Sequence, residues 1–237
     1  MTEMSHSSSA AVAIDWPVRR RLAMVVIGFV PFVLTILVTG STVLAARRWG
    51  FLWGLLCGML VLYLLPPVAY RGISLVFEPQ SGRHAVSSPA FLRWWLAAQL
   101  QVIFNRLTVL EEILRIVPGL YSAWLRLWGA KIGSLVYWSP GVAALDRPLL
   151  CVGSRVVFGA GVRLNPHVIV PGKKTEAQLW LAAVTLGDDC LIGGYSLITS
   201  GCTVPSGVSV PAGKYLRPYC TWQDHQPAES RYEGDSH

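Results

Sequence analysis

The stretch from Leu186 to Tyr215 reads LGDDCL IGGYSL ITSGCT VPSGVS VPAGKY, and it decides the fold because it repeats every six residues. Each unit opens with a large aliphatic residue, and a small or polar residue follows four positions later in most units. The same period begins upstream at Val152, in VGSRVV FGAGVR LNPHVI, with a weaker start at Ile132 in IGSLVY WSPGVA. Strands alternate with a period of two and helices with a period of 3.6, so neither explains this pattern.

A six-residue unit has room for one short strand and one turn. Three units close a triangular coil of eighteen residues, and successive coils stack at the spacing of neighbouring strands. The aliphatic anchors point inward and form the core. They are Val152, Phe158, Leu164, Leu186, Ile192, Ile198, Val204 and Val210. The repeat therefore predicts a mainly β protein with a parallel β-helix over residues 131–220.

These hexads resemble the hexapeptide-repeat acyltransferase family over residues 119–220. LYSAWLRLWGAKIG, which starts at Leu120, is similar to the segment that leads into the coil in the family's serine, sugar and polyketide-linked members. The resemblance implies a left-handed β-helix, a homotrimer with sites between adjacent prisms, and acetyl-CoA or acyl-CoA as co-substrate without a permanently bound cofactor. Two features depart from the family pattern: an apolar N-terminal region and a short C-terminal end, VPAGKYLRPYCTWQDH.

Two uncharged stretches precede the repeats. One runs from Leu22 to Ala46 and the other from Trp49 to Tyr70, with only Arg47 and Arg48 between the stretches. Each is long enough for a helix that crosses a bilayer, so residues 21–71 are predicted to form a transmembrane hairpin behind a tail of residues 1–20. A cleaved signal peptide is the competing interpretation, but the first stretch is too long and lacks a cleavage motif before the second.

Arginine placement predicts the orientation of this hairpin. Arg19, Arg20, Arg21 and Arg71 flank one side, against Arg47 and Arg48 on the other. The side richer in Lys and Arg normally stays in the cytoplasm. We therefore expect a multi-pass protein of a bacterial-type inner membrane, with both termini and the β-helix in the cytoplasm and the cysteines reduced.

Composition supports a membrane protein and argues against two other classes. The 237 residues include 20 Lys+Arg and 13 Asp+Glu, a net charge of +7, yet only 14% are charged and 53% are hydrophobic. Disordered chains have the opposite balance. The basic residues form no stripe on one face, so we expect no nucleic-acid partner. Residues 72–130, rich in Trp, Leu and Arg, are predicted to form amphipathic helices at the membrane interface or packed on the next domain, with a break at Pro118-Gly119.

One interruption of the repeat marks the candidate site. From Val170 to Leu186 the chain runs sixteen residues, so a loop within Pro171–Leu181 is predicted to leave the coil. His167 lies directly before this loop, at an outward-facing turn position. Of the five histidines, only His167 lies in regular repeat structure beside an excursion. Imidazole titrates near neutral pH and can take a proton from a hydroxyl in the transition state.

In the family that the chain resembles, such a histidine is the general base, and it takes a proton from the acceptor that attacks the thioester of coenzyme A. An orienting carboxylate is expected, with Glu176 in the loop and Asp146 one coil earlier as candidates, and Asp188-Asp189 in the following hexad. Asn165 is a candidate for positioning the acceptor or an oxyanion. The catalytic prediction therefore comprises His167, Asn165 and Glu176, with Asp146 left open as a partner.

The resemblance also implies where coenzyme A binds. Its phosphates are expected at Lys173, Lys174, Lys214 and Arg217, because cationic side chains form strong hydrogen bonds with phosphate. The pantetheine arm is expected along the backbone near Gly194, Ser200 and Gly201. We expect no metal, because a γ-type carbonic anhydrase on this fold needs three histidines on one ion and the repeats offer only His167.

Two alternatives stay open at this stage. The donor is either acyl-CoA or an acyl group on a carrier protein, and the sequence does not separate the two. A non-catalytic β-helix that scaffolds a membrane complex is the second alternative. The scaffold alternative predicts that His167 faces outward and that neither residues 171–181 nor a neighbouring subunit form a cleft around it. The expected acceptor is a hydroxyl of a lipid, a lipid-linked sugar or a polyketide-like lipid. Residues 221–237 are expected to form a C-terminal tail.

Overall fold

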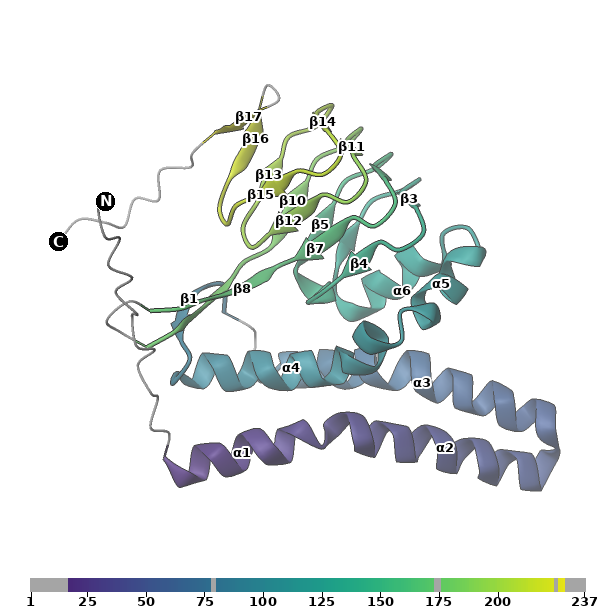
Figure 1. Ribbon diagram of the computed structural model, residues 1–237. Helices are drawn as coiled ribbons and strands as arrows, with labels where there is room; N and C mark the ends of the chain where they lie inside the picture. The colour runs from purple at the N-terminus through teal and green to yellow at the C-terminus, as the bar shows by residue number, and fades with distance from the viewer. Residues whose placement is uncertain (1–16, 78–79, 173–175, 224–225, 229–237) are drawn as a thin grey trace, which may run out of the picture.

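The computed structural model describes residues 17–77, 80–172, 176–223 and 226–228 of the chain. In these residues a stack of β-coils lies on a layer of helices (Figure 1). Three long helices begin the chain: α1 (Val18–Gly28), α2 (Val30–Trp49) and α3 (Phe51–Ser74). Helices α1 and α2 continue one another with a break at Phe29, close to Pro31, which lacks an N–H for the helical ladder.

The hairpin of α2 and α3 turns at Gly50, whose φ of 98° favours glycine. A β-carbon added to Gly54 would lie 2.5 Å from Cβ of Ala46, and one added to Gly58 would lie 2.0 Å from Oγ1 of Thr42. These small residues therefore allow close approach of the two helices, as in membrane helix pairs. Val18–Trp49 and Phe51–Ser74 are each long and apolar enough to cross a membrane.

A second group of helices joins this hairpin to the coil: α4 (Pro89–Arg106), α5 (Val109–Ile116) and α6 (Leu120–Trp128). The Tyr63 hydroxyl on α3 donates to the carbonyl of Leu110, 2.7 Å away, and Nε1 of Trp124 on α6 donates to the carbonyl of Tyr63, 2.9 Å away. Gly119, with a φ of 80°, separates α5 from α6 at the predicted break. The amphipathic segment therefore packs between the hairpin and the coil.

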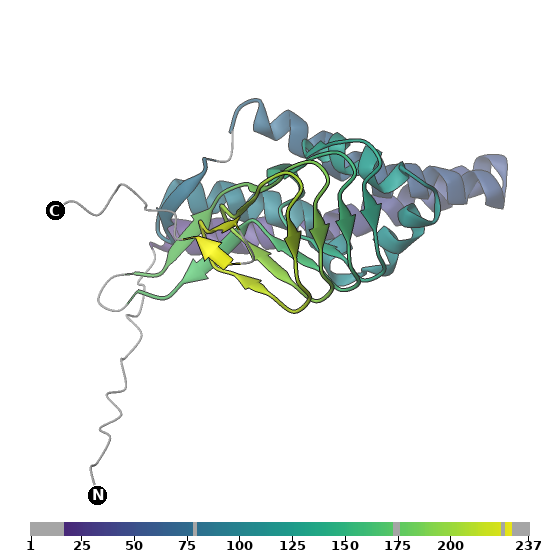
Figure 2. The same cartoon turned by 90° about the horizontal axis from the view of Figure 1, so that it is seen from above.

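Three ladders of parallel strands form the coil, and Figure 2 shows its turns one behind another above the helices. The first ladder contains β2 (Lys131–Ile132), β5 (Leu150–Val152), β10 (Val184–Leu186), β13 (Thr203–Val204) and β16 (Thr221–Gln223), to which β17 (Gln226–Ala228) adds antiparallel. The second contains β3 (Tyr137–Trp138), β6 (Val157–Phe158), β11 (Leu191–Ile192) and β14 (Ser209–Val210). The third contains β4 (Ala143–Ala144), β7 (Arg163–Asn165), β12 (Leu197–Thr199) and β15 (Tyr215–Leu216).

The strand register confirms the predicted coil length. Leu191 pairs with Ser209 and Leu197 with Tyr215, each eighteen positions apart. The first coil is two residues longer, since Tyr137 pairs with Val157, and a 3-10 turn at Arg147–Leu149 takes up the extra length. The left hand of the coil stays a prediction from the family resemblance.

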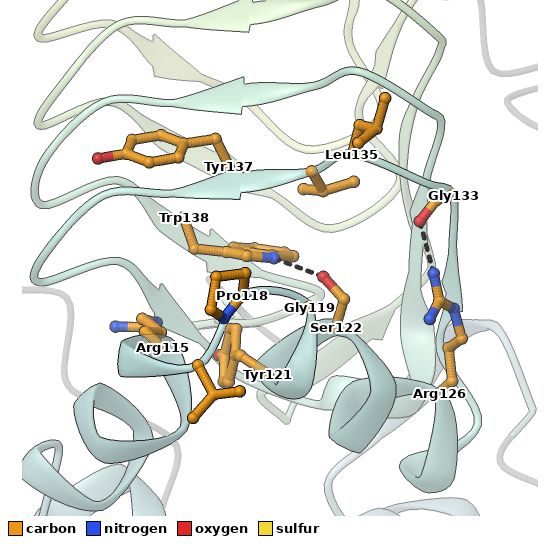
Figure 3. Close-up of a pocket in the computed structure, with 12 residues that line it drawn as sticks. Arg115, Pro118, Gly119, Tyr121, Ser122, Arg126, Gly133, Leu135, Tyr137 and Trp138 are labelled. Carbon is orange, nitrogen blue, oxygen red and sulfur yellow. Dashed lines mark hydrogen bonds between the residues drawn. The ribbon is translucent and has the colours of Figure 1, made fainter.

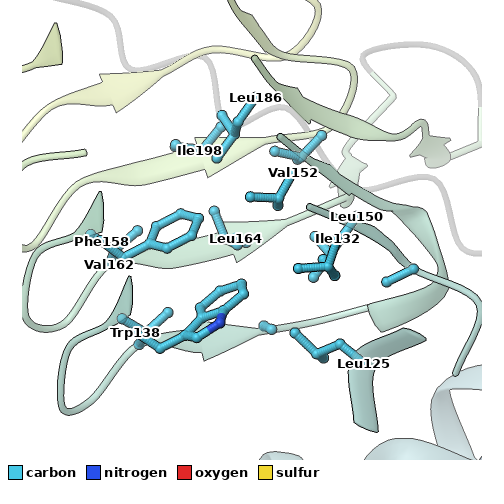
Figure 4. Packing of buried hydrophobic residues seen from close by; sticks show 14 of the residues in the cluster. Leu125, Ile132, Trp138, Leu150, Val152, Phe158, Val162, Leu164, Leu186 and Ile198 are labelled. Atoms are coloured by element: carbon cyan, nitrogen blue, oxygen red, sulfur yellow. The ribbon is translucent and has the colours of Figure 1, made fainter. Parts of the chain in front are cut away.

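All eight predicted anchors are buried. Phe158, Leu164, Ile192, Ile198 and Val204 have no exposed surface, and the remaining three are at most 4% exposed. Figure 4 shows several of these side chains, among them Val152, Leu164 and Leu186, meeting inside the coil. The rings of Trp138 and Phe158 stack there, with centroids 4.5 Å apart. Lys214, at an inward position of the last hexad, is exposed. The expectation of a mainly β protein is not confirmed, because the described residues also include six α-helices of 8 to 24 residues.

Buried polar side chains join the helices to the coil. The guanidinium of Arg147, 1% exposed, contacts the Glu111 carboxylate and donates to Oε1 of Gln101 at 3.0 Å and to Oδ1 of Asn105 at 2.9 Å. Its charge is therefore balanced by Glu111, as a buried ion requires. This network fixes α4 and α5 against the 3-10 turn that directly follows Asp146.

Candidate functional site

The predicted excursion is a β-arm rather than an irregular loop. Strands β8 (His167–Val170) and β9 (Gln178–Leu181) form an antiparallel hairpin, and β1 (Gly82–Ala85) pairs with the outer side of β9. Val157 pairs with Leu191, 34 positions further along instead of 18, so the arm adds sixteen residues to this coil. We call these three strands the arm.

His167 does not occupy the predicted outward turn position. It is the first residue of β8 and lies opposite Leu181 of β9. The repeat ends one residue earlier, because the carbonyl of Pro166 accepts from the N–H of Ala182, where the chain rejoins the coil. The histidine therefore belongs to the base of the arm, where the arm meets the corner of the coil.

Strand alternation places His167 on the face of the arm that meets α4. Residues opposite each other in an antiparallel pair project from the same face, so His167 shares a face with Leu181 and Leu179. These two leucines are buried against Phe91 and Trp94 of α4. The side chain of His167 is 24% exposed and thus lies partly covered, within reach of solvent.

Asp146 is the carboxylate that holds the histidine. Its Oδ2 contacts Nδ1 of His167, and its Oδ1 accepts from Nε1 of Trp94 at 2.9 Å. Asp146 is 6% exposed and adopts the left-handed conformation, with φ of 42°, which directs the side chain from the end of the third ladder toward α4. The ring of Trp94 lies 4.7 Å from the ring of His167, tilted by 58°.

The electrostatics of this group suit a general base. A carboxylate only accepts hydrogen bonds, so Nδ1 of His167 carries the hydrogen and Nε2 keeps the lone pair. Burial on its own lowers the pKa of His167, but the hydrogen bond and the negative charge of Asp146 together outweigh burial and raise this pKa above its ordinary value. Neutral imidazole is thus available as a base only above that raised pKa.

The other predicted carboxylates have different partners. Both oxygens of Glu176 bind Ser87, at 3.0 Å from its N–H and 2.6 Å from its hydroxyl. Asp188 accepts from the N–H of Ser154 at 2.7 Å, and Asp189 forms an ion pair with Arg155. Of the two candidate partners, the structure therefore brings Asp146 to His167, while Glu176 ties the arm to the start of α4.

Asn165 lies two residues before His167, beside Thr199 of the next coil. Its Oδ1 is buried and has no hydrogen-bond partner among the described residues. An unpaired buried acceptor costs free energy, which sets this atom apart from the paired polar groups around it. Its role in binding stays a prediction.

The residues predicted to bind coenzyme A lie at two corners of the coil. Ser200 and Gly201 share the corner of His167: the N–H of Gly201 donates to the carbonyl of Ala182, and the carbonyl of Ser200 accepts from the N–H of Tyr219. Arg217, exposed, lies on the same corner one coil further.

Gly194 and Lys214 occupy a different corner, where the Gly194 carbonyl accepts from the N–H of Gly213. The structure therefore does not bring all the predicted donor residues together. Lys173 and Lys174 lie outside the described residues.

Sequence reasoning missed Trp94. It belongs to FLRWW in α4, outside the repeat, and nothing in the local sequence distinguishes it from Trp95. Sequence reasoning also missed a cation–aromatic group on the face of the arm opposite Leu179 and Leu181. There the Arg83 guanidinium lies 4.3 Å from the centre of the Trp180 ring. The Trp180 ring lies 5.9 Å from the ring of Tyr219.

A pocket of about 530 Å³ lies elsewhere, between the α5–α6 junction and the first coil (Figure 3). There Arg126 donates to the carbonyl of Gly133, and Nε1 of Trp138 donates to Oγ of Ser122. No residue of the arm lines this pocket. Within the described ranges, no group of three or more His, Cys, Asp or Glu residues lies close enough to hold a metal ion.

Comparison with known proteins gives matches of structure only. No family model and no curated protein matches the sequence. A hexapeptide-repeat-containing acetyltransferase from Vibrio cholerae is 14% identical, with a TM-score of 0.40 over 55% of this chain and 91% of that chain. Its complex with acetyl coenzyme A overlaps to a similar extent, at 16% identity, with a TM-score of 0.40 over 56% of this chain and 90% of that chain.

A maltose O-acetyltransferase from Clostridium difficile is 17% identical, with a TM-score of 0.39 over 52% of this chain and 82% of that chain. Serine acetyltransferase isoform 3 from Entamoeba histolytica is 13% identical, with a TM-score of 0.32 over 90% of this chain and 84% of that chain. These values describe a partial overlap between chains of low sequence identity.

Proposed function

We propose that this protein is a membrane-bound acyltransferase that moves an acyl group from acyl-CoA to a hydroxyl of a lipid-borne acceptor, with His167 as general base. The observation that carries the proposal is the contact between His167 and Asp146 at the base of the arm. It combines a partly exposed imidazole with a buried carboxylate that fixes the tautomer.

The chemistry follows from this tautomer. Nε2 of His167 removes the proton from the acceptor hydroxyl, whose oxygen attacks the carbonyl carbon of the thioester. The tetrahedral intermediate then expels the coenzyme A thiolate, which receives the proton from Nε2. Asp146 stabilises the imidazolium that forms in between, without itself taking up the proton. No covalent enzyme intermediate is needed, so neither a serine nor a cysteine nucleophile has a part.

Donor binding is proposed on the corner of the coil that His167 shares with Ser200, Gly201 and Arg217. The Oγ of Ser200 is buried and has no hydrogen-bond partner among the described residues, as is true of Oδ1 of Asn165. These two unpaired polar atoms support a site that is completed by a bound molecule. The cationic side chain of Arg217 is available to the phosphates.

The acceptor is proposed to arrive in the membrane. Two helices are long and apolar enough to cross a bilayer, and their outward side chains, including Phe29, Phe32, Ile36 and Leu52, are more than half exposed. Exposed apolar side chains along two helices of this length are typical of proteins that contact lipid. We further propose that both termini and the coil lie on the cytoplasmic side of an inner membrane, and that the protein is a homotrimer.

Product analysis tests this function. Detergent-solubilised protein is given acetyl-CoA and longer acyl-CoAs, with and without a bacterial lipid extract, and released coenzyme A is followed with a thiol reagent. We expect release that needs both the protein and the extract, with the labelled acyl group in the lipid fraction. No release with any acyl-CoA, together with transfer from acyl carrier protein, would assign the donor to the carrier instead. Inactivity with both donor types would contradict the proposed function and favour a scaffold.

A further inference from the structure

We infer that Trp94 is a positioning residue for the dyad: from helix α4, outside the coil, its indole N–H fixes the Asp146 carboxylate that holds His167. The inference rests on the proposed function, because it concerns the residues that serve the proposed base. It adds a third member to the site, and that member comes from the helical layer and not from the repeat.

The geometry supports this role by three contacts. Nε1 of Trp94 donates to Oδ1 of Asp146 at 2.9 Å, while the other oxygen, Oδ2, contacts Nδ1 of His167. The Trp94 ring lies against the imidazole, with ring centroids 4.7 Å apart. The indole N–H of Trp94 thus binds the Asp146 carboxylate, and the indole ring packs against the imidazole of His167.

The surroundings make the indole hard to move. Trp94 is 5% exposed and packs with Phe91, Leu179 and Leu181, where α4 meets the arm. A buried carboxylate with one oxygen unpaired would pay a desolvation penalty, and Trp94 removes that penalty with a donor that carries no charge. A lysine or arginine in its place would neutralise Asp146 and weaken its effect on His167.

Asp146 is the charged group that acts on His167. It comes from the turn after β4, whereas α4 contributes the uncharged Trp94 and β9 contributes Leu181. The next cation along the chain, Arg147, directs its guanidinium to Glu111, Gln101 and Asn105. A change in the hydrogen bonding of Asp146 is therefore transmitted directly to the imidazole.

Removing the indole N–H of Trp94 should change the pKa of His167 in one direction, upward. The hydrogen on Nε1 carries partial positive charge, which stabilises the Asp146 carboxylate and opposes protonation of the nearby imidazole. Without this hydrogen the carboxylate attracts the His167 proton more strongly, so the pKa of His167 rises further. The carboxylate is also less well fixed, so the fraction of imidazole in the productive orientation falls.

The chain offers a matched control one residue away. Trp95 is also on α4 and packs on the same apolar cluster, and its Nε1 has no hydrogen-bond partner among the described residues. Trp94→Phe and Trp95→Phe therefore delete the same N–H group from neighbouring indoles. In Trp94 this group binds Asp146, and in Trp95 it has no hydrogen-bond partner in the described part of the chain. Both substitutions shorten an aromatic side chain in the same apolar cluster, of which Trp94 is a buried member and Trp95 a partly buried one.

Two readouts are measured on the detergent-solubilised full chain. The first is the pKa of His167, followed by NMR of 13C-labelled histidine with His167→Ala used for assignment, and it requires no activity. The second is kcat and KM for acyl transfer. For Trp94→Phe we expect an upward shift of the His167 pKa and a fall in kcat of about tenfold with little change in KM, since a hydrogen bond to a charged group contributes about that factor. Trp95→Phe is expected to match wild type in both.

Equal effects of the two substitutions would overturn the inference, as would a His167 pKa that Trp94→Phe leaves unchanged or lowers. If wild-type protein transfers no acyl group, the proposed function fails, but the shift of the His167 pKa still decides whether Trp94 positions Asp146. If transfer is normal and Trp94→Phe changes neither kcat nor pKa, the function stands and the role of Trp94 fails.

Discussion

Replacing Asp146 by asparagine removes the charge of this side chain while keeping its shape. Asparagine tolerates the left-handed conformation that Asp146 adopts, with φ of 42°, so the backbone has no reason to move. The amide, however, has one acceptor where the carboxylate has two. If its oxygen faces Trp94, its NH2 group faces Nδ1 of His167, because these two partners bind opposite oxygens of Asp146.

That arrangement inverts the tautomer of His167. An NH2 group at Nδ1 requires this nitrogen to accept, so the hydrogen moves to Nε2 and the lone pair needed for proton abstraction is lost. The opposite rotamer leaves two donors, the indole N–H and the amide NH2, facing each other. General base catalysis typically contributes about 10²- to 10⁴-fold, so we expect kcat to fall by about this factor.

The pH dependence of kcat/KM gives a second test, because its acidic limb reports the pKa of His167. In the wild type the hydrogen bond and the charge of Asp146 together outweigh burial and raise the pKa of His167, so kcat/KM should fall as pH drops through a value above the ordinary pKa of histidine. In Asp146→Asn the raising effect of the carboxylate is gone, while burial still lowers the pKa of His167. The acidic limb of the residual activity should therefore move to lower pH. The direction of this movement follows from the loss of the hydrogen bond and the negative charge of Asp146, the two effects that raise the pKa of His167 in the wild type.

The assay is release of coenzyme A across a pH series, with the unfolding midpoint as a check on folding. Asp189→Asn is the matched control, because Asp189 also has a left-handed backbone, with φ of 58°, but pairs with Arg155 on the surface. The reasoning would be refuted by an Asp146→Asn variant with near wild-type kcat, or by an acidic limb that does not move. A comparable loss in Glu176→Gln, with Asp146→Asn active, would restore Glu176 as the partner of His167.

Three further predictions concern the fold and its anchor. Phe158→Ala removes a fully buried ring from the middle of the coil and should lower the free energy of unfolding by about 3–5 kcal/mol, measured by denaturant titration. Gly201→Ala places a β-carbon 2.4 Å from the Tyr219 ring at φ of 72°, and should cost more stability than Gly207→Ala, at φ of 74° with open space; equal melting temperatures would contradict this. The chain should stay in the membrane pellet after a carbonate wash, and release into the supernatant would argue against helices that span the bilayer.

The register of the coil was predictable because it depends on residues close together in sequence. Each six-residue unit carries its own anchor, and stacking the units in register buries all eight anchors together. The sixteen-residue interruption was visible for the same reason. The two extra residues of the first coil were not, because the turn at Arg147–Leu149 is held by a buried ion pair with Glu111 on α5.

The site was predictable only in part. His167 stood out because it borders the excursion, but its partner depends on how the arm leaves the coil. The antiparallel pairing of β8 with β9 sends Glu176 to Ser87 and turns His167 toward Asp146. Trp94 lies 73 positions before His167, on a helix without a repeat pattern, so no local signal connects the two residues.

The central claim is that His167 acts as the base in acyl transfer. The most direct measurement compares release of coenzyme A by wild type, His167→Ala and His84→Ala, at matched expression and oligomer size. His84 also lies in the arm, but its Nε2 is 2.7 Å from the carbonyl of Gln80. We expect His167→Ala to lose at least about 99% of the acceptor-dependent release, in line with the lower end of general base contributions, and His84→Ala to keep it. Turnover above about a tenth of wild type in His167→Ala would contradict the claim.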